Sequence, residues 1–224
     1  MSEENTKNRG KLMDKNDSPR GAELAKVIRS GFIGDAAKEY VELGIDALLA
    51  SDAAKSIPVV SSIAGIFSAT LSIRDHVFGG KLLRFLSQLS EISESKRNEM
   101  LRKLGENDKF AGRVGEAIIE ILERMESAKK PELAAKCFAA YASEDISFEE
   151  LSRILFALER IPSFDIDKIG KFSRAKIEDA VEMDESVLLA FVNAGLGMNN
   201  GGFDGGAILP TKLCQLFLKA GLVA

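Results

Sequence analysis

Apolar residues recur along most of this chain at intervals of three and four positions, which is the spacing of one face of an α-helix. The spacing starts near Ala22 and continues almost to the last residue. The stretch LGMNNGGFDGGAILP, residues 196–210, differs because glycines and asparagines separate two short apolar runs, a pattern typical of a β-hairpin. The pattern therefore predicts a mainly α protein: a multi-helix bundle with a small C-terminal β-hairpin.

The stretch from Ser56 to Ile73 contains no charged residue. Pro58 suits the first turn of a helix, so we expect one uncharged helix over residues 58–78, followed by a break or a bend at Gly79 and Gly80. Its larger face would carry Val59, Ile63, Ile66, Phe67, Thr70, Ile73, Val77 and Phe78. We expect this face to be packed in a soluble core. The composition also allows an amphipathic surface helix or a marginal membrane span of residues 57–78.

Changes in composition divide the chain into three parts. Residues 1–20 have few apolar side chains and are expected to form a disordered polar tail. Residues 21–130 would form an N-terminal helical region containing the uncharged helix, and residues 131–224 a C-terminal helical region containing the hairpin. The expected boundary is the Lys129-Lys130-Pro131 run.

Several helix starts are marked by residues that cap helices. Serine, threonine and aspartate side chains accept hydrogen bonds from the free N–H groups of a first helical turn. On this basis we expect helices to start after Ser93, Ser147, Asp184 and Thr211, and another to start at Asn107 or Asp108. Ser147 also has a glutamate three residues later, the capping-box pattern.

Composition and charge limit the possible partners and compartment. The chain has 30 basic and 34 acidic residues, a net charge of −4, and no tryptophan, so neither a general attraction to nucleic acid nor a large stacking surface is expected. The N-terminus lacks the apolar region of a secretion signal. Cys137 and Cys214 are expected to be buried thiols in a reducing compartment. We expect a cytoplasmic protein, with a peripheral position at the inner membrane as the alternative.

Residues that could carry chemistry do not form a recognisable constellation. His76 is the one histidine, and catalysis through it would need a carboxylate such as Asp75 or Glu39. Glu116 and Glu120, and Glu149 with Arg153, are better explained as solvated faces with ion pairs. The glycine run lacks the Gly-Lys-Ser/Thr ending of a phosphate loop. We therefore assign no catalytic, cofactor-binding or metal-ligating residue and no cofactor, and expect the chain not to be an enzyme.

The C-terminal third has the chain order of a winged helix, with a helix, a hairpin and a further helix. In that case Asp184 to Asn193 would be the recognition helix, and it would present Asp184 and Glu185 but no lysine or arginine to a DNA groove. Residues 164–224 contain six basic and eight acidic residues. Phosphate would be repelled, so DNA binding through this helix is not favoured.

The chain resembles bacterial proteins of the abortive-infection alpha type, which are associated with phage resistance. The resemblance consists of the Ile-Pro-Val-Val opening at Ile57 to Val60 and of LLAFVNAGL, the glycine hairpin and LPTKLCQLFLKA near the C-terminus. Cys214 stands where such families often have a glycine in the last helix. The resemblance implies a role in phage defence and identifies no catalytic residue.

The function expected from the sequence is that of a non-enzymatic bacterial interaction protein in phage or stress defence. Its partner would be another protein or a second copy of the chain. Two alternatives remain: a membrane-active effector that inserts helix 57–78, and a winged-helix DNA-binding regulator.

Overall fold

The computed structural model describes residues 17–30, 38–51, 58–67, 72–201 and 206–223. It confirms a mainly helical protein with one two-stranded antiparallel hairpin near the C-terminus. The chain forms two compact units, Met1–Arg124 (unit 1) and Met125–Ala224 (unit 2). The division between Arg124 and Met125 precedes the Lys129-Lys130-Pro131 run, which forms the first turn of a helix.

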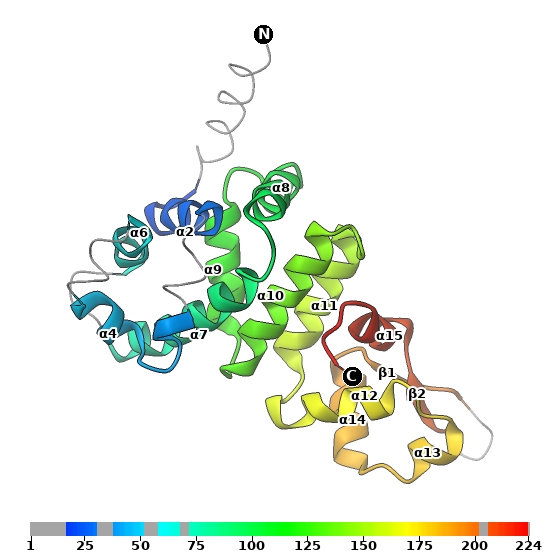
Figure 1. The fold of residues 1–224 in the computed structure, drawn as a ribbon. Helices are drawn as coiled ribbons and strands as arrows, with labels where there is room; N and C mark the ends of the chain where they lie inside the picture. Colours follow the sequence, from blue (N-terminus) through cyan, green and yellow to red (C-terminus); the bar gives the residue numbers. More distant parts are fainter. Residues whose placement is uncertain (1–16, 31–37, 52–57, 68–71, 202–205, 224) are drawn as a thin grey trace. The chain divides into compact units, whose positions relative to one another are not determined.

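Unit 1 is arranged around the helix α2. Its described helices are α2 (Pro19–Arg29), α4 (Ile45–Ala50), α6 (Pro58–Ile66), α7 (Ile73–Leu89), α8 (Glu94–Gly105) and α9 (Val114–Arg124). Helix α2, blue in Figure 1, packs against α6, α8 and α9, while α7 packs against α4 and α9. Leu24, Val27 and Ile28 of α2 are completely buried by these neighbours.

The start of α2 lies within the stretch that the sequence predicted to be a disordered tail. For residues 17–20 that prediction is wrong, and residues 1–16 lie outside the described part of the chain. Ser18 is the N-cap of α2 and accepts a hydrogen bond from the N–H of Gly21 at 3.0 Å. Asp17 accepts hydrogen bonds from the N–H groups of Gly115 and Glu116, both at 2.9 Å, and so caps the start of α9. These contacts attach the polar segment to a distant part of the sequence.

The uncharged stretch is not one helix over residues 58–78, as predicted, but parts of two. Helix α6 ends at Ile66, and α7 starts after Ser72, which forms a capping box with Asp75. The expected burial of Ile63, Ile66 and Phe67 is confirmed, with exposed fractions of 1%, 1% and 9%. Ile73 and Val77 are 84% and 59% exposed instead of buried. Both residues lie on the exposed side of the first turns of α7.

Gly79 and Gly80 lie inside α7 and do not break it, so the prediction of a break is wrong. A Cβ atom on Gly79 would lie 2.6 Å from Cβ of Ile45, which is closer than real Cβ contacts, whereas one on Gly80 would meet nothing within 4 Å. Gly79 therefore permits the close contact between α4 and α7.

Unit 2 consists of helices and the hairpin. Its elements are α10 (Lys129–Ala142), α11 (Phe148–Arg160), the 3₁₀-helix η1 (Ser163–Lys168), α12 (Ile169–Phe172), α13 (Ile177–Val181), α14 (Glu185–Asn193), β1 (Gly197–Asn199), β2 (Ile208–Pro210) and α15 (Lys212–Lys219). Helix α11 packs against α10 and α15, and α15 also packs against α12 and β2. In Figure 1 these are the green to red elements.

The caps predicted in unit 2 are confirmed. Ser147 and Glu150 form a capping box at the start of α11, and the N–H of Cys214 donates to Oγ1 of Thr211 at the start of α15. Asp184 accepts hydrogen bonds from the N–H groups of Ser186 and Val187. In unit 1, Ser93 caps α8 as predicted, but α9 starts at Val114 rather than at Asn107 or Asp108.

The hairpin lies within the predicted range of residues 196–210. Gly197 pairs with Pro210, Met198 with Leu209 and Asn199 with Ile208. The order helix, hairpin, helix that suggested a winged helix is thus present in α14, β1, β2 and α15. The likeness to a winged helix itself stays a prediction.

Candidate interaction surface

His76 is paired with a carboxylate that the sequence did not indicate. Its Nδ1 lies 2.8 Å from Oδ2 of Asp46, and both side chains are largely open to solvent. Asp75 accepts hydrogen bonds from the backbone N–H and the hydroxyl of Ser72, which lower the pKa of its carboxyl group. No hydrogen bond found among the described residues links the His76–Asp46 pair to a hydroxyl or thiol. The described contact is a histidine–aspartate pair at the surface of unit 1.

The carboxylates that the sequence grouped as ion-paired faces have separate partners. Glu120 pairs with Arg113, and Oε1 of Glu149 lies 3.2 Å from Nη2 of Arg153. Glu116 instead accepts a hydrogen bond from the hydroxyl of Ser18. These contacts satisfy the carboxylates individually, and none converges on a common point. Among the described residues no group of three histidine, cysteine, aspartate or glutamate side chains could hold a metal ion.

Both cysteines are buried, as predicted. Burial raises the pKa of the Cys214 thiol to about 12 and raises that of Cys137 as well. Because the thiolate is the reactive form, both groups are inert at neutral pH.

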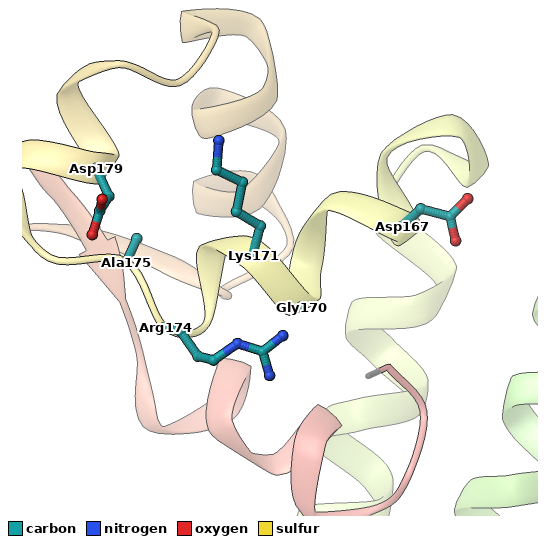
Figure 2. A pocket seen from close by; sticks show the side chains of 6 residues that line it. All are labelled: Asp167, Gly170, Lys171, Arg174, Ala175 and Asp179. Atoms are coloured by element: carbon teal, nitrogen blue, oxygen red, sulfur yellow. The ribbon is translucent and has the colours of Figure 1, made fainter.

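An open pocket of about 460 Å³ lies beside α12. Asp167, Gly170, Lys171, Arg174, Ala175 and Asp179 line it. In Figure 2 the side chains of Lys171 and Arg174 extend in different directions, and Asp167 points away from both. A ligand site needs polar groups that converge on one position. This pocket does not provide that arrangement.

Exposed apolar side chains mark a different part of unit 2. Among the described residues ten large apolar side chains are exposed, and five of them fall between Ile177 and Met198. They are Ile177 (50%), Val181 (69%), Leu189 (54%), Val192 (40%) and Met198 (56%). Single exposed apolar residues are common, but these five lie within one short stretch of the sequence.

Within this stretch, α14 presents one continuous exposed side, which we call the α14 face. Glu185, Ser186, Leu189, Val192 and Asn193 make up this face, and each of them is exposed. Leu189 and Val192 are three positions apart and therefore neighbours on the helix surface. The face is apolar in its middle and polar at both ends of the helix.

The opposite side of α14 holds the helix rigidly in unit 2. Val187, Leu188, Phe191 and Ala194 are buried, and the ring of Phe191 lies 4.7 Å from the ring of Phe172. The hydrogen bonds from Ser186 and Val187 keep the pKa of Asp184 below its ordinary value. A helix that is capped and packed on one side can present its other side without rearrangement.

The sequence carries a signal for this face in the length of its apolar run. Val187 to Val192 are six consecutive apolar residues, whereas a helix packed on one side only needs apolar residues at every third or fourth position. The surplus residues must be exposed unless a second surface covers them. In the described structure Leu189 and Val192 are those residues.

The α14 face has no basic residue with which to contact phosphate. The cations nearest in sequence are Lys176 and Lys212. The expectation that this helix does not bind DNA stays a prediction. Among the described residues no helix has both the length and the apolar composition needed to cross a bilayer.

Comparisons with known proteins give no assignment. No family model matches the chain, and neither the curated proteins nor the solved structures include a significant match. The functional interpretation therefore depends on the residues and geometry described above.

Proposed function

We propose that this chain is a non-enzymatic cytoplasmic protein that acts by binding another protein, and that the α14 face is its binding surface. The supporting observation is the exposure of Leu189 and Val192 as neighbours on a helix whose opposite side is packed. Aliphatic side chains on a rigid helix gain free energy when a partner covers them, because apolar surface leaves water. A role in bacterial phage or stress defence is the proposed setting, and its support is the sequence resemblance alone.

Two alternative functions stay predictions, and the geometry favours neither. A membrane-active effector would have to release Val60, Ile63 and Ile66, which are nearly fully buried in unit 1. A DNA-binding regulator would have to approach phosphate with the α14 face, which carries Glu185 and no lysine or arginine. Both would work against the contacts or charges present in the structure.

The proposed function is tested by a double variant of the surface, Leu189→Ser with Val192→Ser. Because both side chains are exposed, we expect the free energy of unfolding to change by less than about 0.5 kcal/mol for each substitution. Crosslinking in the producing cells, followed by mass spectrometry, should show a specific partner for the wild type and its loss for the variant. Retention of the partner by the folded variant would refute the assignment of the α14 face.

A matched control is Ile73→Ser, which removes an even more exposed apolar side chain from unit 1. We expect this control to keep the partner. The setting is tested separately by deleting the gene and measuring phage plaque formation. Unchanged plaque formation over a broad set of phages, together with unchanged survival under stress, would contradict the defence role.

A further inference from the structure

Charge is distributed very unevenly around the exposed apolar residues of unit 2. Between Lys176 and Lys212 the sequence contains no basic residue, but it contains Glu178, Asp179, Glu182, Asp184, Glu185 and Asp204. This contrasts with the chain as a whole, in which 30 basic residues nearly balance 34 acidic ones. The five exposed apolar side chains between Ile177 and Met198 all lie in this stretch, whose charged residues are all acidic.

The acidic groups lie next to the apolar part of the α14 face. Glu185 is one helical turn before Leu189 on the same side of the helix. Glu182 and Asp184 directly precede the helix, and both are exposed. Lys168 is a cation close enough to act on Asp184, but its ammonium group is already paired with Asp165 at 2.7 Å. Glu182, Asp184 and Glu185 thus place three exposed carboxylates at or just before the first turn of α14.

From this arrangement we infer that the α14 face binds a protein segment in which apolar side chains are flanked by lysine or arginine. This inference rests on the proposed function and specifies the chemistry of its partner. Leu189 and Val192 would cover the apolar side chains of the segment, while Glu182 and Glu185 would attract its cations. Such complementarity chiefly increases the association rate and selects against acidic partners.

The same charges disfavour two other classes of partner. Nucleic acid and anionic lipid surfaces both present negative charge, which the acidic end of α14 repels. The contact surface on one short helix is also small, so the complex is expected to be weak and sensitive to salt.

The test uses three synthetic peptides and the full chain. The first peptide has leucines and lysines at helical spacing, the second has glutamates in place of the lysines, and the third has serines in place of the leucines. We expect the wild-type chain to bind the first peptide at least about tenfold more tightly than either of the others, measured by fluorescence anisotropy. Raising the salt from about 0.05 M to about 0.5 M should weaken this binding severalfold.

Two double variants separate the apolar and charged contributions. Leu189→Ser with Val192→Ser, and Glu182→Gln with Glu185→Gln, should each weaken binding of the leucine-lysine peptide by about tenfold. Asp184 is left unchanged because it caps α14. The matched charge control is Glu39→Gln with Asp108→Asn, two exposed carboxylates of unit 1, and it should bind as the wild type does.

Several outcomes would overturn the inference. Equal binding of the leucine-lysine and leucine-glutamate peptides would do so, and so would unchanged binding by either α14 double variant. Binding of anionic phosphatidylglycerol vesicles or of random duplex DNA that depends on Leu189 and Val192 would assign the face to a different class of partner.

The cellular crosslinking distinguishes failure of this inference from failure of the proposed function. If the serine double variant loses the partner and the glutamine double variant keeps it, the α14 face is the binding surface but its charge does not select the partner. If both variants keep the partner, the inference and the proposed function are both wrong.

Discussion

Unit 1 and unit 2 fix their helices in different ways. In unit 1, both ends of α2 are joined to helices that are distant in the sequence. Asp17, just before α2, caps α9, and Arg97 of α8 donates hydrogen bonds to the carbonyl oxygens of Ile28 and Ser30 at the end of α2. In unit 2, α11, α14 and α15 start at caps formed by residues beside them in the sequence. Unit 1 therefore adds tertiary contacts at the ends of α2 and α9 to its local caps at Ser18, Ser72 and Ser93, whereas these three helices of unit 2 start at local caps.

The units also differ in how closely their helices approach. Gly21 and Gly115 allow α2 and α9 to cross with their backbones in contact, because a Cβ atom on Gly115 would lie 1.9 Å from the carbonyl oxygen of Gly21. Unit 2 packs α14 through side chains such as Phe191 against Phe172. It keeps apolar side chains on its surface. The comparison shows that α2 and α9 of unit 1 cross through glycines, whereas α14 of unit 2 packs through aromatic side chains. Both units expose large apolar side chains, such as Ile73 and Leu189.

The largest effect is expected for Gly115→Ala. The added methyl group would force α2 and α9 apart, and we expect a loss of at least about 3 kcal/mol in the free energy of unfolding of unit 1. Gly80→Ala is the matched control, since its methyl group meets open space within a helix and should stabilise by up to about 1 kcal/mol. Urea unfolding would measure the loss of stability. Hydrogen exchange would assign it to unit 1 if exchange becomes faster at residues 19–29 and stays unchanged at residues 129–160. A variant as stable as the wild type would disprove the close crossing.

A second large effect is expected for Arg97→Met. Arg97 is 3% exposed, and burial lowers the pKa of its guanidinium group, which also donates a hydrogen bond to the carbonyl oxygen of Ile92 at 2.6 Å. Removing it leaves carbonyl oxygens without their donor, so we expect a loss of about 3 kcal/mol. Arg102→Met is the control, because Arg102 pairs with Glu99 at the surface and should cost less than about 1 kcal/mol. Equal losses for the two variants would contradict the role of Arg97 in holding α2.

A smaller effect should separate distant from local caps. Asp17→Ala and Ser147→Ala each remove one cap, and each should cost about 1 kcal/mol. The location of the effect should differ: Asp17→Ala should increase hydrogen exchange in both α2 and α9, whereas Ser147→Ala should increase it only at the start of α11. If the effect of Asp17→Ala stayed within the residues next to it, the described difference between the units would be wrong.

A helix start can be predicted from the sequence when its cap lies next to it in the sequence. Ser147, Asp184 and Thr211 lie directly before the helices that they cap, so the sequence alone identified these starts. The start of α9 was predicted at Asn107 or Asp108 because its actual cap, Asp17, is remote in the sequence. The stretch after Pro58 reads as one helix because apolar periodicity continues through it. Ser72 and Asp75, three positions apart, form the capping box that marks the start of the second helix.

The α14 face was only partly predictable. The sequence identified the helix, its Asp184 cap and its lack of basic residues. It did not identify Leu189 and Val192 as the exposed members of an apolar run, since that depends on which side packs against Phe172 and the hairpin. For the same reason the pairing of His76 with Asp46, rather than with Asp75 or Glu39, followed from the packing of α4 on α7.

The sequence by itself determined the helical class, the hairpin and the local helix starts, because periodicity, turn residues and caps act over a few neighbouring positions. Only the tertiary structure decided where Asp17 and Arg97 act, why Gly115 must lack a side chain and which apolar residues face solvent. These features depend on groups that are distant in sequence and adjacent in space, and no local pattern along the chain records that adjacency.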